Sequence, residues 1–566
     1  MHEKVLYINL FKILVNENKI IGDFLSSNAL QKKVLKKVLD LGIDFINGET
    51  RNNRVIHYKS IKELQQIVSK FDDYNSSYST EESFELLKEI GKYSISQSDL
   101  GYIAFPDSGN ALPAMMAEIY SKFLNQNLSG VDRSAPIATF IEIQLIEWLR
   151  GLVGYESKRF EDIKSLAEVS GMCTTGGHMS NHIAIMGALN EKFPEIKRIG
   201  LTKLGKTPKI ILADAISHYS FSSAMHHLGL GQKNILVAKT KDDFTTDFDD
   251  VEKLIKKYNK RDEIFMIVAV AGNSRTSSID NLEKFAEISC KYKIWLHVDA
   301  CHGGSLLFSK RLKEKYLKGI EKADSISIDP HKGMFVTYPS SYVLFKERDI
   351  LVHFTRYEEK VRNGSSWDLG YITPFYGSRG FESLKLWFLI KTFGKSYLEE
   401  IVEKRERDAK FIAKKISETN KFVLLNDIEL YRLAFVFIPR QVKNLLQHEN
   451  LDESKKKSVK DCIDYFSHRL NQDLYEDGRL ILDEFKLSDL ANRVGLDLGM
   501  EKYCVMSISI GNPLLTEEVL RKNVKYLRNR AKLYEKKYFM EITKIISGKE
   551  YIKKKENIHY GPAGWT

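Results

Sequence analysis

Four side chains that could take part in catalysis lie at or just after the ends of stretches that are expected to be strands. In "SISIDPHKG", the polar and apolar alternation of Ser325–Ile328 is typical of a half-buried strand, and His331 and Lys332 come directly after it. "IWLHVDACHGG" places Asp299 at the end of another strand, and "KIILADAISHYS" is followed by His218. A lysine supplies an amine, a carboxylate can pair with a protonated ring nitrogen, and an imidazole can stack on an aromatic ring.

A glycine-containing loop, "GMCTTGGHMSN", opens an expected helix and offers backbone N–H groups to an anion at Gly177, His178, Met179 and Ser180. "VAVAGNSRTSS" places Asn273 after a further strand. Taken singly, each residue has an ordinary structural explanation, such as a helix cap, a solvated lysine or a loop that binds nothing. Taken together, an amine, a carboxylate and a phosphate-sized anion site meet the demands of pyridoxal phosphate.

The elements that must position these residues alternate between strands and helices from about residue 170 to 345. The expected strands are "KIILAD", "NILVAK", "EIFMIVAVAG", "IWLHVDA", "DSISIDP" and "SYVLF". Helical patterns between them indicate βαβ units and a mostly parallel sheet. In such a sheet the carboxyl ends of the strands share one edge, where ligands bind. "FMIVAVA" is apolar throughout, as is typical of a strand covered on both faces.

The pattern predicts four segments along the chain. Residues 1–100 form a mostly helical segment, in which "STEE" is expected to cap a helix near Glu81. Residues 101–390 form a large cofactor-binding α/β domain, and residues 391–535 form a small α+β domain. Residues 536–566 are a lysine-rich tail.

Composition narrows the class of protein. The net charge is +11, but the lysines are spread out and no nucleic-acid-binding motif is present, so we expect small anionic ligands and no nucleic acid. The five cysteines are widely spaced without a CxxC pair, which favours reduced thiols and a cytoplasmic location. No apolar run approaches the length of a membrane span, and no signal peptide or metal site is expected.

Several motifs, in order, resemble the pyridoxal-phosphate-dependent decarboxylases of the group that includes glutamate, aromatic-amino-acid and diaminobutyrate decarboxylases. The matching stretches include "TTGGHMSN", "ISHYSFSSAMHHLGLG", "ADSISIDPHKG" and "GSRGFESLKLWFLIKTFG". Asp299 precedes Lys332 by 33 residues, a spacing compatible with that family. The resemblance is strong from about 170 to 390, and residues 1–80 and 535–566 match nothing in the family. It implies an α/β fold of type I, with a mostly parallel central sheet covered by helices on both faces, an N-terminal helical segment and a small C-terminal α+β domain.

The resemblance also implies roles for individual residues. Lys332 resembles the lysine that forms an imine with pyridoxal phosphate, and its pKa is expected to be lowered by burial and neighbouring cations. Asp299 resembles the partner of the pyridine nitrogen, and His218 resembles the histidine that stacks on the ring. The remaining implied cofactor-binding residues are Gly177, His178, Met179, Ser180, Asn273 and His331.

In the family a loop tyrosine often protonates Cα. Here Tyr357 is the prediction, with Tyr371 as the alternative. Arg379 lies where the family often has two arginines.

The predicted activity is decarboxylation of an L-amino acid at its α carbon, giving a primary amine. Other carbanion chemistry on the same fold stays open, as an aldehyde synthase or a carbon–carbon or carbon–sulfur lyase, because Asn273 and His302 are not standard substrate-facing residues. A non-catalytic binding protein is the third possibility. By analogy with the family we expect a homodimer with shared active sites, wrapped by the N-terminal helices.

Overall fold

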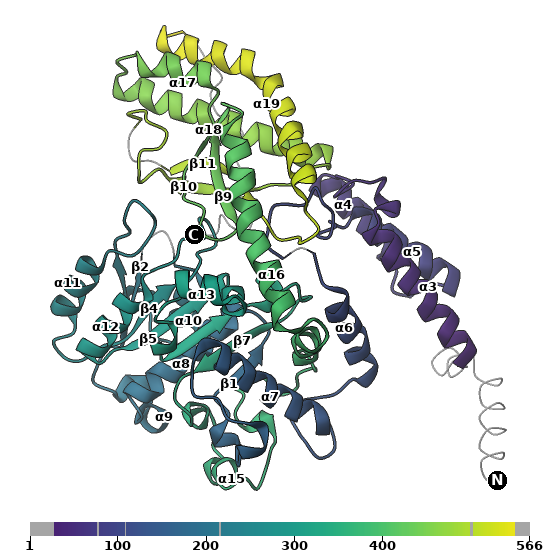
Figure 1. Cartoon of the computed structure of the whole chain (residues 1–566), viewed down its shortest axis with the longest axis vertical. Coiled ribbons are helices and arrows are strands. Elements are labelled where there is room, and N and C mark those ends of the chain that lie inside the picture. Colours follow the sequence, from purple (N-terminus) through teal and green to yellow (C-terminus); the bar gives the residue numbers. More distant parts are fainter. Residues whose placement is uncertain (1–27, 76–77, 108, 214–216, 499–501, 550–566) are drawn as a thin grey trace. The chain divides into compact units, whose positions relative to one another are not determined.

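A computed structural model describes residues 28–75, 78–107, 109–213, 217–498 and 502–549 (Figure 1). The chain divides into two units. The first comprises Met1–Asp99 with Glu476–Arg479, and the second comprises Leu100–Tyr475 with Leu480–Thr566. The start of the predicted N-terminal segment and residues 550–566 of the predicted tail lie outside the described residues.

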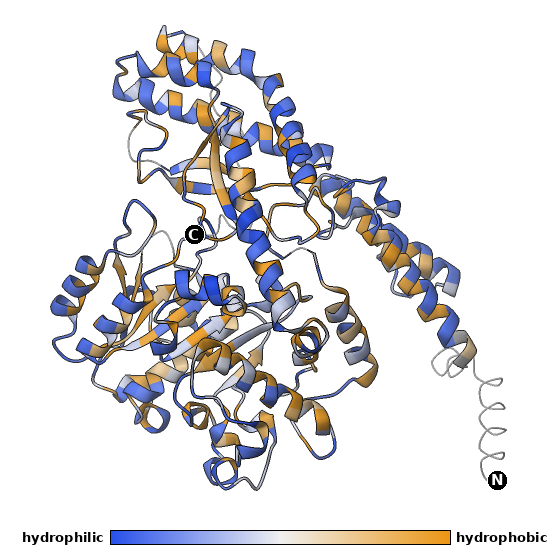
Figure 2. Ribbon diagram, in the orientation of Figure 1, coloured by the Kyte–Doolittle hydropathy of each residue, from blue (hydrophilic) through white to orange (hydrophobic). Residues whose placement is uncertain are grey.

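The first unit is helical, as the sequence predicts. Its helices are α3 Asn28–Ile46, α4 Ile61–Val68 and α5 Thr80–Tyr93. The "STEE" stretch caps α5: the Ser79 hydroxyl accepts the Glu82 N–H, and the Glu82 carboxylate accepts the Ser79 N–H at 2.7 Å. Figure 2 shows apolar and polar residues side by side along α3 and α5, the pattern of amphipathic helices.

A sheet of seven strands forms the centre of the second unit, in the order β1-β7-β6-β5-β4-β2-β3. The strands are β1 Gly171–Thr174, β2 Lys209–Ala213, β3 Ile235–Ala238, β4 Ile264–Val270, β5 Trp295–Ala300, β6 Ser325–Ile328 and β7 Ser341–Phe345. The mostly parallel sheet is confirmed, with β7 antiparallel to its two neighbours. All seven residues of β4 are buried, as the continuous apolar run predicts.

Six of the seven strands were expected from the sequence, and β1 was not. Its four residues were assigned to the glycine loop, because a strand of four residues is too short to show an alternation of polar and apolar side chains. Pairing with β7 buries all four of them. A long-range contact therefore decided this strand.

Helices surround the large sheet (Figure 1). They are α6 Leu112–Leu124, α7 Pro136–Val153, α8 Gly177–Lys192, α9 Ile196–Ile199, α10 Ser220–His227, α11 Phe248–Tyr258, α12 Leu282–Tyr292, α13 Lys310–Tyr316, α14 Pro330–Gly333 and α15 Glu358–Arg362. N-caps begin α11 and α12: the Asp247 carboxylate accepts N–H groups of the first turn of α11, and the Asn281 side chain does the same for α12.

A smaller antiparallel sheet, in the order β10-β11-β9-β8, forms the C-terminal part of the second unit. Its strands are β8 Phe422–Leu424, β9 Arg432–Phe437, β10 Asp483–Ser488 and β11 Lys502–Ser509. The helices of this part are α16 Ser383–Ser417, α17 Arg440–Gln447, α18 Glu453–Asp477 and α19 Glu517–Ile546. α16 is interrupted at Gly394, whose φ of 73° is non-helical.

The last helix continues past the boundary predicted at residue 535. α19 runs to Ile546 and buries Tyr538, Ile542 and Ile545. Lysines on the exposed side of the helix made this stretch look like a tail, whereas its apolar side is part of the core.

Parallel pairing brings the predicted site residues to one edge of the large sheet. β5 lies between β4 and β6, with Asp299 in register with Val270 on one side and Ser327 on the other. After its last residue, β4 leads to Asn273, β5 leads to Cys301 and β6 leads to Lys332. The carboxyl ends of the strands therefore supply neighbouring side chains, as expected for this class of fold.

Close packing at this edge requires glycine at position 303. The Gly303 N–H donates to the Ala271 carbonyl at 2.9 Å, and a Cβ on residue 303 would overlap that carbonyl oxygen. We expect Gly303→Ala to lower the melting temperature, because the backbone must shift at a cost of about 1–3 kcal/mol. Gly377→Ala is the control, since a Cβ there meets nothing within 4 Å. Circular dichroism melting checks this, and equal melting temperatures for the two variants would contradict it.

Candidate active site

A pocket at the carboxyl edge of the large sheet gathers six of the ten predicted site residues. These six are Gly177, His178, His218, Asn273, Asp299 and Lys332. The other residues that line the pocket are Asn181, Val270, Gly272, Ser274, Cys301 and His302. A helix start, a carboxylate, an imidazole and an amine thus share one cavity.

Lys332 is held by an aspartate that the sequence analysis left without a role. The Lys332 Nζ lies 2.8 Å from Asp329 Oδ2, and the Asp329 side chain is fully buried. The Ser341 hydroxyl donates to Asp329 Oδ1 at 2.6 Å. Burial lowers the pKa of the Lys332 amine, but the Asp329 carboxylate outweighs burial and holds that pKa well above its usual value. The expectation of a lowered pKa is therefore wrong, because the nearest charge is an anion.

Asp299 ends a chain of buried hydrogen bonds between α8 and the sheet. The Asn181 amide donates to Asp299 Oδ2 at 3.0 Å, and the Cys301 N–H donates to Asp299 Oδ1 at 3.1 Å. The Asn181 amide oxygen accepts from His297 Nε2 at 3.1 Å and from the Ser327 hydroxyl at 2.6 Å. These contacts fix the orientation of the carboxylate toward the pocket.

His297 is neutral within this network. Burial lowers the pKa of His297 to about 4. Its Nδ1 lies 2.8 Å from the Ser325 hydroxyl, which also accepts the Trp295 indole N–H at 2.8 Å. With Nδ1 accepting from Ser325, Nε2 carries the proton that it donates to Asn181.

The start of α8 offers backbone N–H groups that can bind an anion. The N–H groups of Met179 and Ser180 donate to the Gly176 carbonyl, so this helix start presents the N–H groups of Gly177 and His178. The Cβ position of Gly176 has nothing within 4 Å, which leaves open space next to the first turn. A Cβ on Gly177 would instead overlap Cys301 Sγ and lie 2.7 Å from Asp329 Oδ2. Gly177 thus allows the helix start to approach the lysine end of the site.

His218 and His331 differ in their access to the pocket. His218 lines it, and its Nδ1 accepts the Ser220 N–H at 3.2 Å. Burial, with the Lys332 charge adding to it, lowers the pKa of His218 to about 4, so the imidazole is neutral. His331 is buried beside the pocket instead, with Nδ1 2.6 Å from the Ser340 carbonyl and Nε2 3.7 Å from Asp329 Oδ2.

Two pocket residues had kept other chemistries open. The Asn273 side chain is occupied by its own turn: Oδ1 accepts the N–H groups of Arg275 and Thr276 at 2.8 Å, and Nδ2 donates to the Thr276 hydroxyl. His302 Nδ1 lies 2.6 Å from the Tyr431 hydroxyl. Burial holds the pKa of His302 well below its usual value. Neither side chain is placed as a free acid or base.

Four other residues singled out in the sequence lie outside the lining of this pocket. The Ser180 hydroxyl bonds to Thr174 at 2.7 Å, and the Arg379 guanidinium forms a bidentate pair with Glu142 at 2.7 and 2.8 Å. Tyr357 is 37% exposed and its ring lies 4.7 Å from that of Tyr371. Met179, in the first turn of α8, is half-buried against the core.

The sequence contained signals for the residues that were missed. His297 and Asp299 are two apart in a strand, so they share a face, and Ser325 and Ser327 share the same face of the next strand. Polar residues at alternate positions of otherwise apolar strands indicate a buried polar network. Asp329 belongs to the "DPHK" stretch itself, where attention went to the lysine and the histidine.

The donor set fits pyridoxal phosphate. The N–H groups at the start of α8 suit its phosphate, the Lys332 amine suits its aldehyde, and the Asp299 carboxylate suits its ring nitrogen. The neutral His218 imidazole suits stacking on the ring. Fold and pocket together define an enzyme of the type I pyridoxal-phosphate class.

Comparison with known proteins gives the family. Residues 87–438 match the pyridoxal-dependent decarboxylase conserved domain. The chain belongs to this family, and it is an amino-acid decarboxylase that uses pyridoxal phosphate. The prediction of decarboxylation is confirmed, and the alternative carbanion chemistries are not favoured.

Several relatives are similar over most of the chain. Aspartate 1-decarboxylase of Aliivibrio fischeri is 27% identical over 480 residues, covering 81% of this chain and 85% of the relative. Human cysteine sulfinic acid decarboxylase is 25% identical over 443 residues, covering 76% of this chain and 86% of the relative. A crystal structure of mouse CSAD in apo form has the same fold, with a TM-score of 0.78 and 21% identity over 89% of this chain and 99% of that one.

Across the described ranges, no helix combines the length and the apolar character that crossing a bilayer requires.

The Lys332–Asp329 ion pair is expected to set the pH at which pyridoxal phosphate attaches to Lys332. The uncharged amine is the form that bonds to an aldehyde. We expect Asp329→Asn to lower the Lys332 pKa, and each unit of that decrease raises the uncharged fraction about ten-fold. Attachment of pyridoxal phosphate to cofactor-free protein at pH 7 should therefore be faster, with a pH profile displaced to lower pH. Stopped-flow absorbance measures both.

Ser341→Ala is the matched control for this experiment. It removes a hydrogen bond to Asp329 but leaves the charge in place. Its pH profile should stay close to that of the unmodified protein. An Asp329→Asn profile that coincides with the Ser341→Ala profile would contradict the assignment.

Proposed function

We propose that the pocket around Lys332 removes the α-carboxylate of an L-amino acid, with Lys332 as the residue that attaches the cofactor and Asp299 as the partner of its ring nitrogen. The observation that supports this most directly is the meeting of the lysine, the carboxylate and the start of α8 in one pocket. When bound, pyridoxal phosphate accepts the electron pair that the departing carboxylate leaves on Cα.

The remaining assignments concern what the side chains of the chain do around that chemistry. Asp299 keeps a proton on the ring nitrogen, and the bonds from Asn181 and Cys301 keep the carboxylate aimed at it. His218, neutral because of burial, would stack on the ring and hold its plane. The N–H groups of Gly177 and His178 would bind the phosphate, and His331, which is buried beside the pocket, is assigned to binding the same cofactor. Asn273 shapes the pocket wall through its turn.

Reprotonation of Cα needs a donor, and Tyr357 remains our prediction, with Tyr371 as the alternative. The two rings lie together, and an Arg356 N–H donates to the Tyr357 hydroxyl at 2.8 Å. Both tyrosines lie on the segment between β7 and α16.

Lys332→Ala tests the assignment of the site. After borohydride reduction, intact-mass measurement should find the cofactor attached to the unmodified protein and to Lys310→Ala, an exposed-lysine control, but not to Lys332→Ala. Decarboxylation should fall by at least about a thousand-fold in Lys332→Ala alone. Cofactor retained on Lys332→Ala would contradict the proposal.

A panel of amino acids identifies the substrate and the reaction in the same preparation. The names of the relatives make aspartate and cysteine sulfinate the first candidates, followed by glutamate and diaminobutyrate. Carbon dioxide with a primary amine is the expected outcome. An aldehyde with ammonia would instead support the alternative chemistry.

We also propose that the chain acts as a homodimer, and an apolar stripe on α6 supports this. Leu112, Met116, Tyr120 and Phe123 recur at helical spacing and are 52–69% exposed. Exposed apolar stripes of this kind mark protein–protein contacts. In the first unit, α3 carries a second such stripe, with Leu35, Leu39 and Ile43 more than 40% exposed, in keeping with N-terminal helices that wrap a partner.

Charges placed on the α6 stripe test the dimer. We expect sedimentation to show a dimer for the unmodified protein and a monomer for Leu112→Glu/Met116→Glu, because burying two carboxylates at the interface is costly. The matched control is Leu533→Glu/Met540→Glu, whose residues are 69% and 50% exposed, compared with 69% and 52% for the test pair. Identical sedimentation of the two variants would count against α6 as the interface.

A cytoplasmic location is supported by the cysteines, all five of which have free thiols. Burial holds the pKa of the Cys301 thiol, in the pocket wall, well above its usual value, so this thiol stays protonated. Fractionation of cells that produce the protein would check the location.

A further inference from the structure

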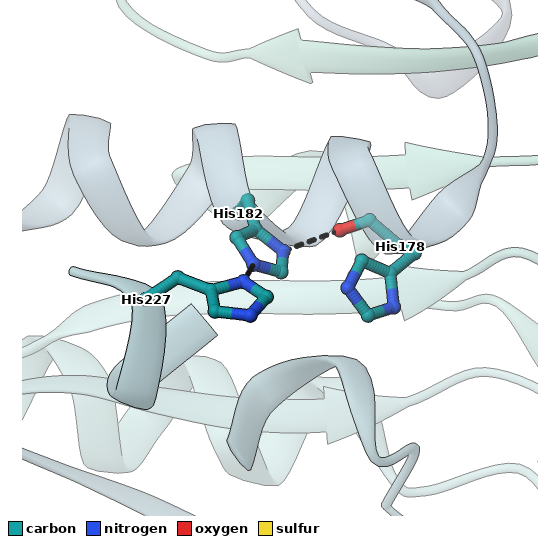
Figure 3. A group of neighbouring side chains, drawn as sticks. All are labelled: His178, His182 and His227. Carbon is teal, nitrogen blue, oxygen red and sulfur yellow. Dashed lines mark hydrogen bonds between the residues drawn. The ribbon is translucent and has the colours of Figure 1, made fainter. Parts of the chain in front are cut away.

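Three histidines meet beside the pocket, and the activity proposed above uses only the backbone of one of them. His178 and His182 lie four residues apart on the first turns of α8, and His227 is the last residue of α10 (Figure 3). One nitrogen from each ring can be chosen so that all three lie within 4.8 Å of one another. We propose that His178, His182 and His227 form a site for a divalent transition-metal ion, with zinc as the reference ion.

His182 has the orientation of a metal ligand. Its Nδ1 donates to the His178 carbonyl at 2.8 Å, which fixes the ring and turns Nε2 toward His227 (Figure 3). Ligating histidines commonly hand their second nitrogen to a carbonyl or carboxylate in this way. The ring is 5% exposed, so its position is set by packing as well as by this bond.

The spacing of the nitrogens suits a shared ion. His182 Nε2 and His227 Nδ1 are 3.2 Å apart and share a hydrogen bond, whose proton a bound ion would replace. Two nitrogens bound to one tetrahedral zinc at about 2.0–2.1 Å are separated by about 3.3 Å. The two rings therefore already have the separation that an ion between them requires.

The third ring, that of His178, is close to the other two, and its ring nitrogens are available to bind a metal ion. The His178 ring stacks on the His182 ring with centroids 4.6 Å apart and planes at 27°. Within the described part of the chain, no hydrogen bond to the ring nitrogens of His178 is recorded, and no carboxylate pairs with any of the three rings. One nitrogen of the His178 ring already lies within 4.8 Å of a nitrogen of each of the other two rings.

The chemistry of the donors defines the class of ion. Three imidazoles without a carboxylate or thiolate suit zinc, copper, nickel and cobalt, and do not suit magnesium or calcium, which need oxygen ligands. His227 is exposed, so the ion has a path from solvent and a water can complete its coordination. Bound there, the ion would link the first turns of α8 to the end of α10.

The test uses untagged, cofactor-loaded protein freed of metal. Cobalt is titrated first, because its visible bands report tetrahedral coordination, and zinc is then added to displace it. We expect one cobalt per chain, displacement by zinc, and a higher melting temperature with zinc, since an ion that binds only the folded chain stabilises it. His227→Ala and His182→Gln should each weaken binding by at least about ten-fold and remove the gain in melting temperature.

His226→Ala is the matched control. His226 is the exposed neighbour of His227 at the same helix end and does not belong to the cluster. It should bind cobalt and zinc like the unmodified protein. Absence of cobalt and zinc binding in the unmodified protein, or binding that survives in both His227→Ala and His182→Gln, would overturn the proposal. Equal losses in His226→Ala and His227→Ala would overturn it too.

Discussion

Parallel pairing of β5 with β6 is the constraint on which the site depends. Both strands run in the same direction, with Asp299 opposite Ser327, so the carboxylate and the lysine that follows β6 emerge at the same edge. An antiparallel pair would send them to opposite ends of the sheet. Every other contribution to the pocket, from the turn after β4 to the start of α8, is added around this pair.

The interior of the sheet is unusually polar at this point, and the polarity has a positioning role. Four polar residues are buried here: Asn181, His297, Ser325 and Ser327. They form hydrogen bonds with one another in place of hydrogen bonds with water. Burying such groups is tolerable only when they are paired. Because this network is anchored on the strands of the sheet, it holds the Asp299 carboxylate in one orientation.

The small C-terminal sheet reaches the pocket through specific contacts. Tyr431, next to β9, bonds to His302, and Arg405 of α16 donates to the Gly333 carbonyl and to the Ile510 carbonyl. These bonds connect the helix that carries Lys332 to the C-terminal part of the same unit. The C-terminal part therefore supports the pocket at two places, at His302 and at the helix that carries Lys332.

The sequence by itself determined the strands that carry Asp299 and Lys332, the helix that opens at Gly177, and the class of cofactor, because alternation, apolar runs and a glycine loop are local patterns. It did not determine β1, which exists through pairing with β7, or the continuation of α19, which exists through burial of one face. Nor did it determine the charge state of Lys332: burial and neighbouring cations were expected to lower its pKa, whereas folding placed the Asp329 carboxylate against the amine. The histidine cluster likewise joins residues 45 apart in the chain. Electrostatics and coordination depend on distance in space, and only the tertiary structure sets that distance.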